Sequence, residues 1–167
     1  MRLLTGTRPY SILVVEENAS DVFLLQRALA RQQIDFQLTH LRYGAEALVF
    51  VRREVPYANR PRPDLILVDL NQAKSDGECV IREVRNARHL DGVPVCVWFS
   101  AESSYDRESL NRLGVDEFIV KPSGLDQFMQ IGKTVKDLLF GELDGATPAF
   151  SRKMLRSRHP PTNTFAP

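Results

Sequence analysis

This sequence of 167 residues lacks most features of secreted and membrane proteins. It contains two cysteines, Cys79 and Cys96; nothing supports a disulfide between them, and we expect buried thiols in a reducing compartment. It has no run of about 18 apolar residues, so no membrane-spanning helix is expected. Residues 1–10 lack the continuous apolar core of a secretory signal. We therefore expect a protein of the cytoplasm.

An excess of charge of either sign is also absent. The chain carries 22 basic and 21 acidic residues, a net charge of +1, which gives no reason to expect binding to nucleic acid or to a membrane surface. The histidines His40, His89 and His159 are too scattered to form a metal site. With 43% hydrophobic and 26% charged residues, the composition is that of a globular domain with a buried core.

Short apolar runs rich in β-branched residues alternate five times with segments of helical periodicity. Strands are expected at 11–15, 36–41, 65–68, 95–99 and 117–120, and helices at 19–33, 44–53, 78–88, 104–113 and 125–143. This alternation requires parallel pairing through right-handed crossovers, with helices on both faces. It predicts an α/β fold with a flavodoxin-like, doubly wound, five-stranded parallel sheet of order 2-1-3-4-5.

The composition also suggests where the domain ends. We expect an N-terminal segment at 1–9, the α/β domain at 10–143 and an extended or disordered tail at 144–167. The tail holds four of the ten prolines and no acidic residue after Asp144. Its basic cluster is too short to contain a folded DNA-binding module.

Polar side chains follow four of the expected strands. Glu16 and Glu17 follow the first strand, Asp69 the third, Ser100 the fourth and Lys121 the fifth. Each is an ordinary strand-end residue when taken alone, but a 2-1-3 order places the first and third strands about 4.8 Å apart. Crowded carboxylates with room for water suit Mg²⁺, a lysine can bind a phosphoryl oxygen, and a carboxylate can attack phosphorus. The pattern therefore predicts a phosphoryl-transfer site at this edge of the sheet.

Several sequence blocks resemble the signature motifs of response-regulator receiver domains, over about residues 10–142. The blocks are Ile12–Asn18, Asp64–Asn71, Ser75–Gly77 and Lys121–Pro122. A finer match, from Tyr57 to Asn71, is similar to the single-domain regulators paired with phytochrome histidine kinases.

This resemblance implies a phosphoacceptor and a magnesium site. Asp69 stands at the phosphoacceptor position, and Lys121 at that of the phosphoryl-binding lysine, followed by a cis bond to Pro122. Phe118 stands at the position of the switch aromatic residue. The expected ligands of Mg²⁺ are Glu16, Glu17, Asp69 and the backbone carbonyl of Asn71.

The implied function is that of a signalling protein and not of an enzyme. A histidine kinase of the bacteriophytochrome kind would phosphorylate Asp69, and the signal would pass on through protein contacts, because no DNA-binding domain is expected. The same resemblance implies a homodimer formed through the last helix and the tail.

The sequence departs from the family pattern at two functional positions. Glu17 stands where the family has aspartate, and Phe99 stands where a threonine or serine is usual. Ser100 comes one residue late; because neighbouring strand residues face opposite sides, we do not expect it to reach a phosphoryl group without a β-bulge. Phe99 and Phe118 can each be read as a core residue or as part of the switch.

These departures leave two other functions open. One is a receiver-like scaffold or dimerisation module that no longer uses phosphate, which Glu17 and Phe99 favour. The other is a phosphatase of the haloacid-dehalogenase type. That chemistry needs a second aspartate two residues after the nucleophile, where this sequence has Asn71.

Overall fold

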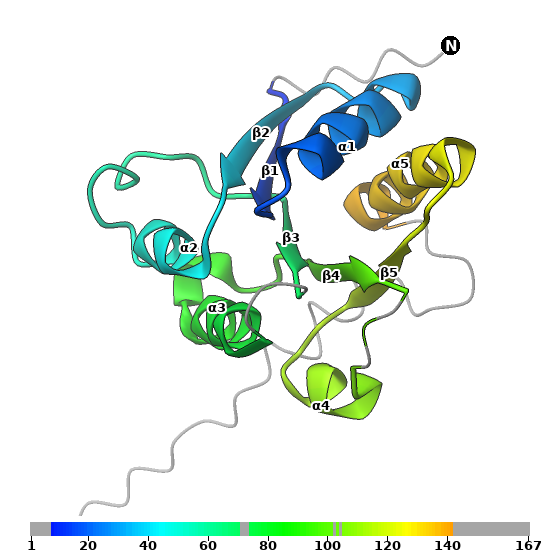
Figure 1. The fold of residues 1–167 in the computed structure, drawn as a ribbon. Coiled ribbons are helices and arrows are strands. Elements are labelled where there is room, and N and C mark those ends of the chain that lie inside the picture. The colour runs from blue at the N-terminus through cyan, green and yellow to red at the C-terminus, as the bar shows by residue number, and fades with distance from the viewer. Residues whose placement is uncertain (1–7, 71–73, 102, 104, 142–167) are drawn as a thin grey trace, which may run out of the picture.

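Five short strands form one parallel sheet of order β2-β1-β3-β4-β5 in the computed structural model, which describes residues 8–70, 74–101, 103 and 105–141 (Figure 1). The strands are β1 (Tyr10–Val15), β2 (Phe36–Leu41), β3 (Leu65–Asp69), β4 (Val95–Ser100) and β5 (Glu117–Lys121). All four strand pairs are parallel, so the expected fold class and strand order are confirmed.

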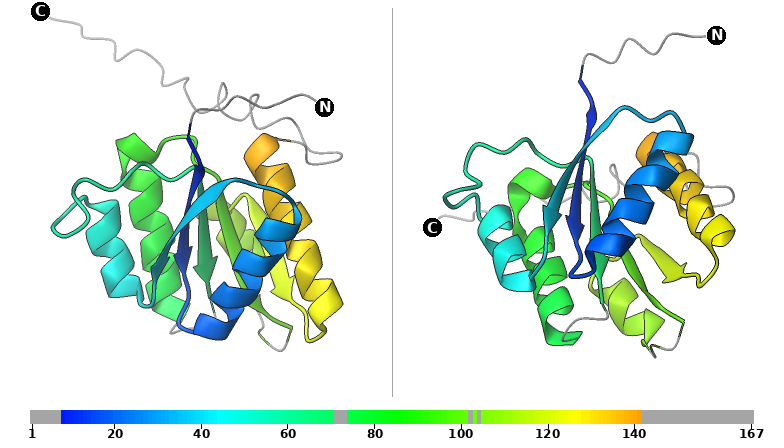
Figure 2. Two further views of the ribbon diagram at one scale, coloured as in Figure 1. Left: turned by 90° about the horizontal axis from the view of Figure 1, so that it is seen from above. Right: turned by 45° about the horizontal axis from the view of Figure 1, so that its top comes forward.

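Helices cover both faces of this sheet, as the two views of Figure 2 show. α1 and α5 pack together on one face, and α2 packs against α3 on the other, where α4 also lies. The helices are α1 (Ala19–Arg31), α2 (Gly44–Val51), α3 (Lys74–Asn86), α4 (Arg107–Arg112) and α5 (Leu125–Phe140), with a short 3₁₀ helix η1 (Arg88–Leu90). None of them, within the described part of the chain, is long and apolar enough to cross a membrane.

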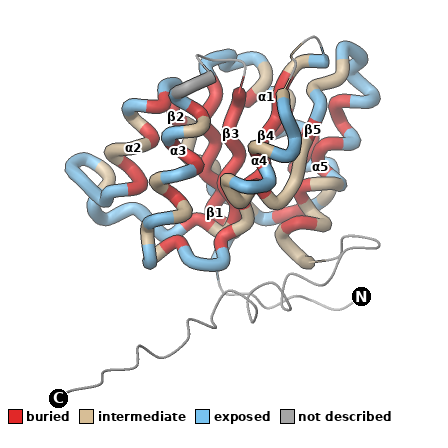
Figure 3. The backbone as a smooth tube through the Cα atoms, turned by 90° about the horizontal axis from the view of Figure 1, so that it is seen from below, coloured by how far each residue is buried: buried red, intermediate tan, exposed pale blue. Residues whose placement is uncertain are grey.

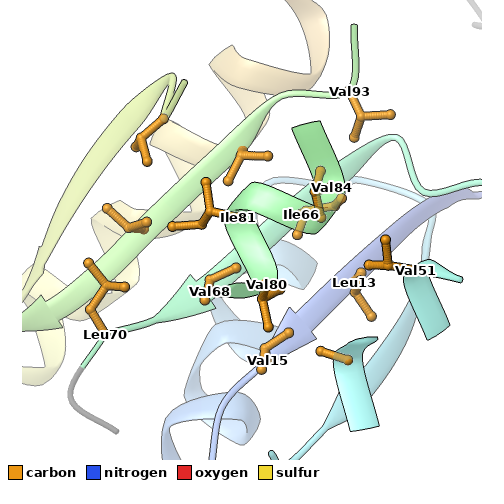
Figure 4. Packing of buried hydrophobic residues seen from close by; sticks show 14 of the residues in the cluster. Leu13, Val15, Val51, Ile66, Val68, Leu70, Val80, Ile81, Val84 and Val93 are labelled. Carbon is orange, nitrogen blue, oxygen red and sulfur yellow. The ribbon is translucent and has the colours of Figure 1, made fainter. Parts of the chain in front are cut away.

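The central strands are buried on both faces (Figure 3), as expected for a parallel sheet between two helical layers. In β4, Val95, Val97 and Phe99 join the core beneath α2, α3 and α4, part of which is drawn in Figure 4. Cys96 and Trp98 point to the opposite core, beneath α1 and α5. This alternation decides which strand-end side chains face the same cavity.

The start of α3 differs from the expectation. The sequence predicts a loop through Gly77, but the helix begins at Lys74. Gly77 is buried in the first turn, and a Cβ there would lie 2.7 Å from Cδ2 of Leu70. The glycine therefore allows close helix packing and is not a loop residue. The expectation that Cys79 is buried is also wrong, because Val80, Ile81 and Val84 take the inward face of α3.

The helices α1, α2, α4 and α5 are all shorter than expected, and the new ends of α4 and α5 have identifiable causes. The α4 helix begins at Arg107 because Asp106 caps it, accepting a hydrogen bond from the backbone N–H of Glu108 at 3.1 Å. The α5 helix ends at Phe140, where Gly141 takes a left-handed φ of 72°.

The expected tail lies outside the described residues. The cis bond expected before Pro122 is also wrong: the cis peptide bond in the described chain precedes Pro56.

Close packing of α1 against α5 sets the position of the first turn of α1. A Cβ on Gly132 would lie 2.3 Å from the carbonyl oxygen of Ala28, so only glycine permits this approach. Asn18 caps α1, accepting from the N–H of Ser20 at 3.0 Å. The helix therefore begins directly beside the carboxyl ends of the strands.

Candidate functional site

The carboxyl edge of the sheet holds a cavity of about 410 Å³ with charged walls. Val15 pairs with Val68, so the residues that follow them, Glu16 and Asp69, are neighbours across two strands. Ser100 pairs with Lys121 in the same way. The cavity is lined by Glu16, Glu17, Asn18, Asp21, Asp69, Ser100 and Lys121.

The ammonium group of Lys121 lies among three carboxylates. It donates hydrogen bonds to Glu16 Oε2 at 2.6 Å, Asp21 Oδ2 at 2.9 Å and Asp69 Oδ2 at 3.2 Å. Its side chain is 10% exposed and that of Asp69 is 5% exposed, so these charges meet with little water between them. Such charge-assisted hydrogen bonds are stronger than those between neutral groups.

Glu16 is the most deeply buried charged residue of the site, with 1% of its surface exposed. Its Oε1 accepts from the N–H of Asn18 at 2.8 Å, and its backbone carbonyl accepts from Nε2 of His40 at 2.6 Å. The pKa of Glu16 is raised to about 7, chiefly by burial and also by the negative charge of Asp69, although the hydrogen bonds from Lys121 and Asn18 act in the opposite direction. A cation is therefore favoured here.

Lys121 remains a cation despite its burial. Burial alone lowers the pKa of Lys121, but the hydrogen bonds to Glu16 and Asp21 and the charge of Asp69 raise it above its ordinary value. The same Nζ lies 4.6 Å from the centroid of the Trp98 ring, within the range of a cation–π contact. The indole nitrogen of Trp98 is buried and has no hydrogen-bond partner among the described residues.

Two of the expected magnesium ligands do not join the buried cluster of the described residues. Glu17 lines the cavity but is exposed to solvent, and Asn71 lies outside the described residues. Within the described part of the chain, no three acidic, histidine or cysteine side chains converge to enclose an ion. Mg²⁺ commonly uses one or two carboxylates and keeps several waters, so the oxygen donors and volume of this cavity fit that ion.

Phe99 and Phe118, the two residues expected to act as a switch, both face the core beneath α2, α3 and α4, whereas Ser100 faces the other side of the sheet. Phe99 is 7% exposed and belongs to the core beneath α3 and α4, whereas Ser100 lines the cavity with Asp69 and Lys121. No bulge is needed for this, because the cavity lies on the side to which Lys121, its register partner, also points. Phe118 is half-buried, with the guanidinium of Arg107 5.2 Å from its ring centroid.

Asp21 is a residue of the site that the sequence reasoning missed. It lies in the first turn of α1, three residues after the capping Asn18, and binds Lys121. A capping residue followed three positions later by an acid marks the start of a helix. That spacing could have indicated that Asp21 faces the strand ends.

Tyr105, in the loop before α4, was also missed. Its hydroxyl donates to the backbone carbonyl of Leu70, the residue directly after Asp69. Burial raises the pKa of Tyr105, and the charges of Asp69 and Glu78 raise it further. No strand-end argument could place it, because it lies five residues beyond the end of β4.

Comparisons with known proteins agree with this geometry. A family model described as the response regulator receiver domain matches residues 12–133. Response regulator Rcp1 of Synechocystis sp. is 34% identical over 123 residues, which is 74% of this chain and 84% of Rcp1.

Two solved structures are similar over most of the chain. The phosphorylated cyanobacterial phytochrome response regulator RcpA is 35% identical, with a TM-score of 0.69 over 84% of this chain and 98% of that one. The Mn²⁺-bound form of response regulator Rcp1 is 31% identical, with a TM-score of 0.69 over 84% of this chain and 99% of that one.

Proposed function

Because the chain belongs to the response regulator receiver domain family, we propose that it is a single-domain regulator that accepts a phosphoryl group from a histidine kinase on Asp69. The observation that carries this proposal is the contact of Lys121 with Asp69 and Glu16 inside one cavity. Similarity to RcpA and Rcp1 supports a cytoplasmic phytochrome-linked two-component pathway as its context.

In the proposed reaction, an Asp69 carboxylate oxygen attacks the phosphorus of a phosphohistidine on the kinase. As the new P–O bond forms, the P–N bond breaks and its electron pair returns to the imidazole. Lys121, already 3.2 Å from Oδ2 of Asp69, holds one phosphoryl oxygen, and Ser100 offers a hydroxyl from the same wall. Asp69 is 5% exposed, so the attacking group has little contact with bulk water.

Magnesium is the cofactor that suits this site. It would be held by Asp69, Glu16 and Glu17, with the backbone carbonyl of Asn71, and would neutralise the charge that develops during transfer. Glu17 must turn inward for this, and its side chain, one methylene longer than aspartate, gives it the reach. The Mn²⁺ in the similar Rcp1 structure supports a divalent ion.

Exposed apolar side chains on α1 and α5 support docking of a kinase. Phe23, on α1, is 59% exposed, and Leu125, the first residue of α5, is 60% exposed. Both helices begin at the carboxyl edge of the sheet, where the cavity lies. Exposed apolar groups beside a polar site are typical of a protein contact.

The proposal includes a homodimer formed through α5 and the tail. A groove of about 510 Å³ runs between β5 and α5, and Val120 at its wall is 43% exposed. Phe118, one candidate switch residue, lines the same groove, so phosphorylation at Asp69 can be coupled to the contact. Sedimentation of wild type and Val120→Lys, each with and without acetyl phosphate, tests this assembly.

Acetyl phosphate with Mg²⁺ tests the phosphoacceptor directly. Wild type should gain the mass of one phosphoryl group and Asp69→Asn should not, whereas Asp76→Asn, an exposed aspartate on α3, should behave as wild type. Equal labelling of wild type and Asp69→Asn excludes Asp69 as the acceptor.

A phosphate-independent scaffold is the second candidate, favoured by the outward position of Glu17 and the core position of Phe99. It requires that beryllofluoride with Mg²⁺ does not bind. Native mass spectrometry separates the two functions, because a phosphoacceptor retains beryllofluoride and a scaffold does not.

A further inference from the structure

A phosphoryl group has three acceptor oxygens, and the side-chain donors that the described strands β4 and β5 bring to the cavity lie on one side of the sheet. Lys121 and Ser100 are register partners and line the same wall. On the other side, β4 presents the ring of Phe99, which is packed in the core and carries no hydroxyl. A donor on that side must come from outside the strand.

The side chain of Tyr105 brings a hydroxyl to this position. Its ring packs on Phe99, with centroids 5.4 Å apart and planes inclined at 59°. Its hydroxyl reaches the backbone carbonyl of Leu70, next to Asp69 in the chain. The charge of Asp69 acts on this hydroxyl, so the group lies within the electrostatic field of the phosphoacceptor.

We propose that the hydroxyl of Tyr105 detects phosphorylation of Asp69, exchanging its hydrogen bond with the Leu70 carbonyl for one with a phosphoryl oxygen. This inference rests on the proposed function of Asp69 as phosphoacceptor. It assigns Tyr105 as a positioning residue of the switch, in place of a hydroxyl at position 99.

The direction of the exchange follows from charge. A carbonyl oxygen is neutral, whereas a phosphoryl group adds about 1.5 to 2 negative charges, and a hydrogen bond to a charged acceptor is stronger. Because Tyr105 precedes α4 by two residues and packs on Phe99, its movement carries both the start of α4 and the end of β4.

The test removes only the hydroxyl. Tyr105→Phe keeps the ring on Phe99, and Tyr57→Phe is the matched control, because its hydroxyl binds Glu46 away from the cavity. The double variant Phe99→Thr with Tyr105→Phe lacks the tyrosine hydroxyl but has a threonine hydroxyl at position 99 of β4. Each protein is labelled with acetyl phosphate and Mg²⁺, and backbone amide NMR shifts of α4 are then measured with and without beryllofluoride and Mg²⁺.

We expect all four proteins to be labelled on Asp69. In Tyr105→Phe, the beryllofluoride-induced shifts of α4 should fall by roughly twofold or more, while Tyr57→Phe keeps them and the double variant regains them. Shifts in Tyr105→Phe equal to those of wild type overturn the role of Tyr105 and leave Asp69 as the acceptor. Absence of labelling in wild type overturns the proposed function itself and this inference with it.

Discussion

The ammonium of Lys121 lies 2.6 Å from Oε2 of Glu16 but 3.2 Å from Oδ2 of Asp69. The lysine is therefore bound more closely to an expected metal ligand than to the expected phosphoacceptor. It supplies the positive charge that the buried carboxylates require. Under the proposed function, a divalent ion held by Glu16 and Asp69 would supply this charge instead, and Lys121 would then be available to a phosphoryl oxygen.

Removal of Lys121 should expose the cost of burying Glu16. We expect Lys121→Met to lower the free energy of unfolding by about 2–3 kcal/mol at neutral pH without metal, because Glu16 then loses its counterion and must either stay charged or take up a proton. Adding Glu16→Gln should recover part of this loss, since a neutral amide needs neither a counterion nor a proton. Urea denaturation in the presence of a chelator gives the free energies of unfolding of wild type, the two single variants and the double variant, which together form a double-mutant cycle. Additive effects of the two substitutions would show that the pair does not interact.

Trp98, the single tryptophan of the chain, should report the movement of Lys121. Because the ammonium lies 4.6 Å from the ring centroid, addition of Mg²⁺ should change the fluorescence of wild type in a saturable way. Lys121→Met should lose most of this change. The control is Lys133→Met, which removes an exposed lysine that binds Asp137. If Mg²⁺ changed the fluorescence of Lys121→Met as much as that of wild type, Trp98 would not be reporting the movement of Lys121.

The contribution of Asp64 to the free energy of unfolding should depend on pH. Burial acts to raise the pKa of Asp64, but hydrogen bonds from Arg8 and the N–H of Ser11, with the charges of Arg8 and Arg62, lower it below the ordinary value. A lowered folded-state pKa stabilises the protein above the unfolded value of about 3.9, and the gain is lost as pH falls through the folded value.

Asp64→Asn should therefore be less stable than wild type by about 1–2 kcal/mol at neutral pH. The difference should narrow as the pH falls below about 4. Thermal unfolding across this range gives the comparison. A difference that stays constant with pH would mean that the charge of Asp64 contributes nothing.

The sequence predicts the contact of Glu16, Asp69 and Lys121 because parallel strands end at one edge of the sheet. Those three residues directly follow or end β1, β3 and β5, so strand order alone brings them together. Strand order does not fix the direction in which a side chain just beyond the end of a strand points. Glu17 is exposed for that reason, while Glu16 is buried.

Residues on helices and loops could not be placed from the strand pattern. Asp21 depends on where α1 begins, and Tyr105 depends on the path of the loop between β4 and α4. The close approach of Gly132 to Ala28 depends on how α1 and α5 pack. These contacts follow from tertiary packing, which local periodicity does not specify.

The central claim is that Asp69 carries the phosphoryl group. Borohydride reduces an acyl phosphate to an alcohol, so treatment of acetyl phosphate-labelled protein converts a phosphorylated aspartate to homoserine. Peptide mass spectrometry then locates the converted residue among the acids of the cavity. The account predicts homoserine at position 69; a modified acid at Glu16, Glu17 or Asp21, with Asp69 intact, would contradict it.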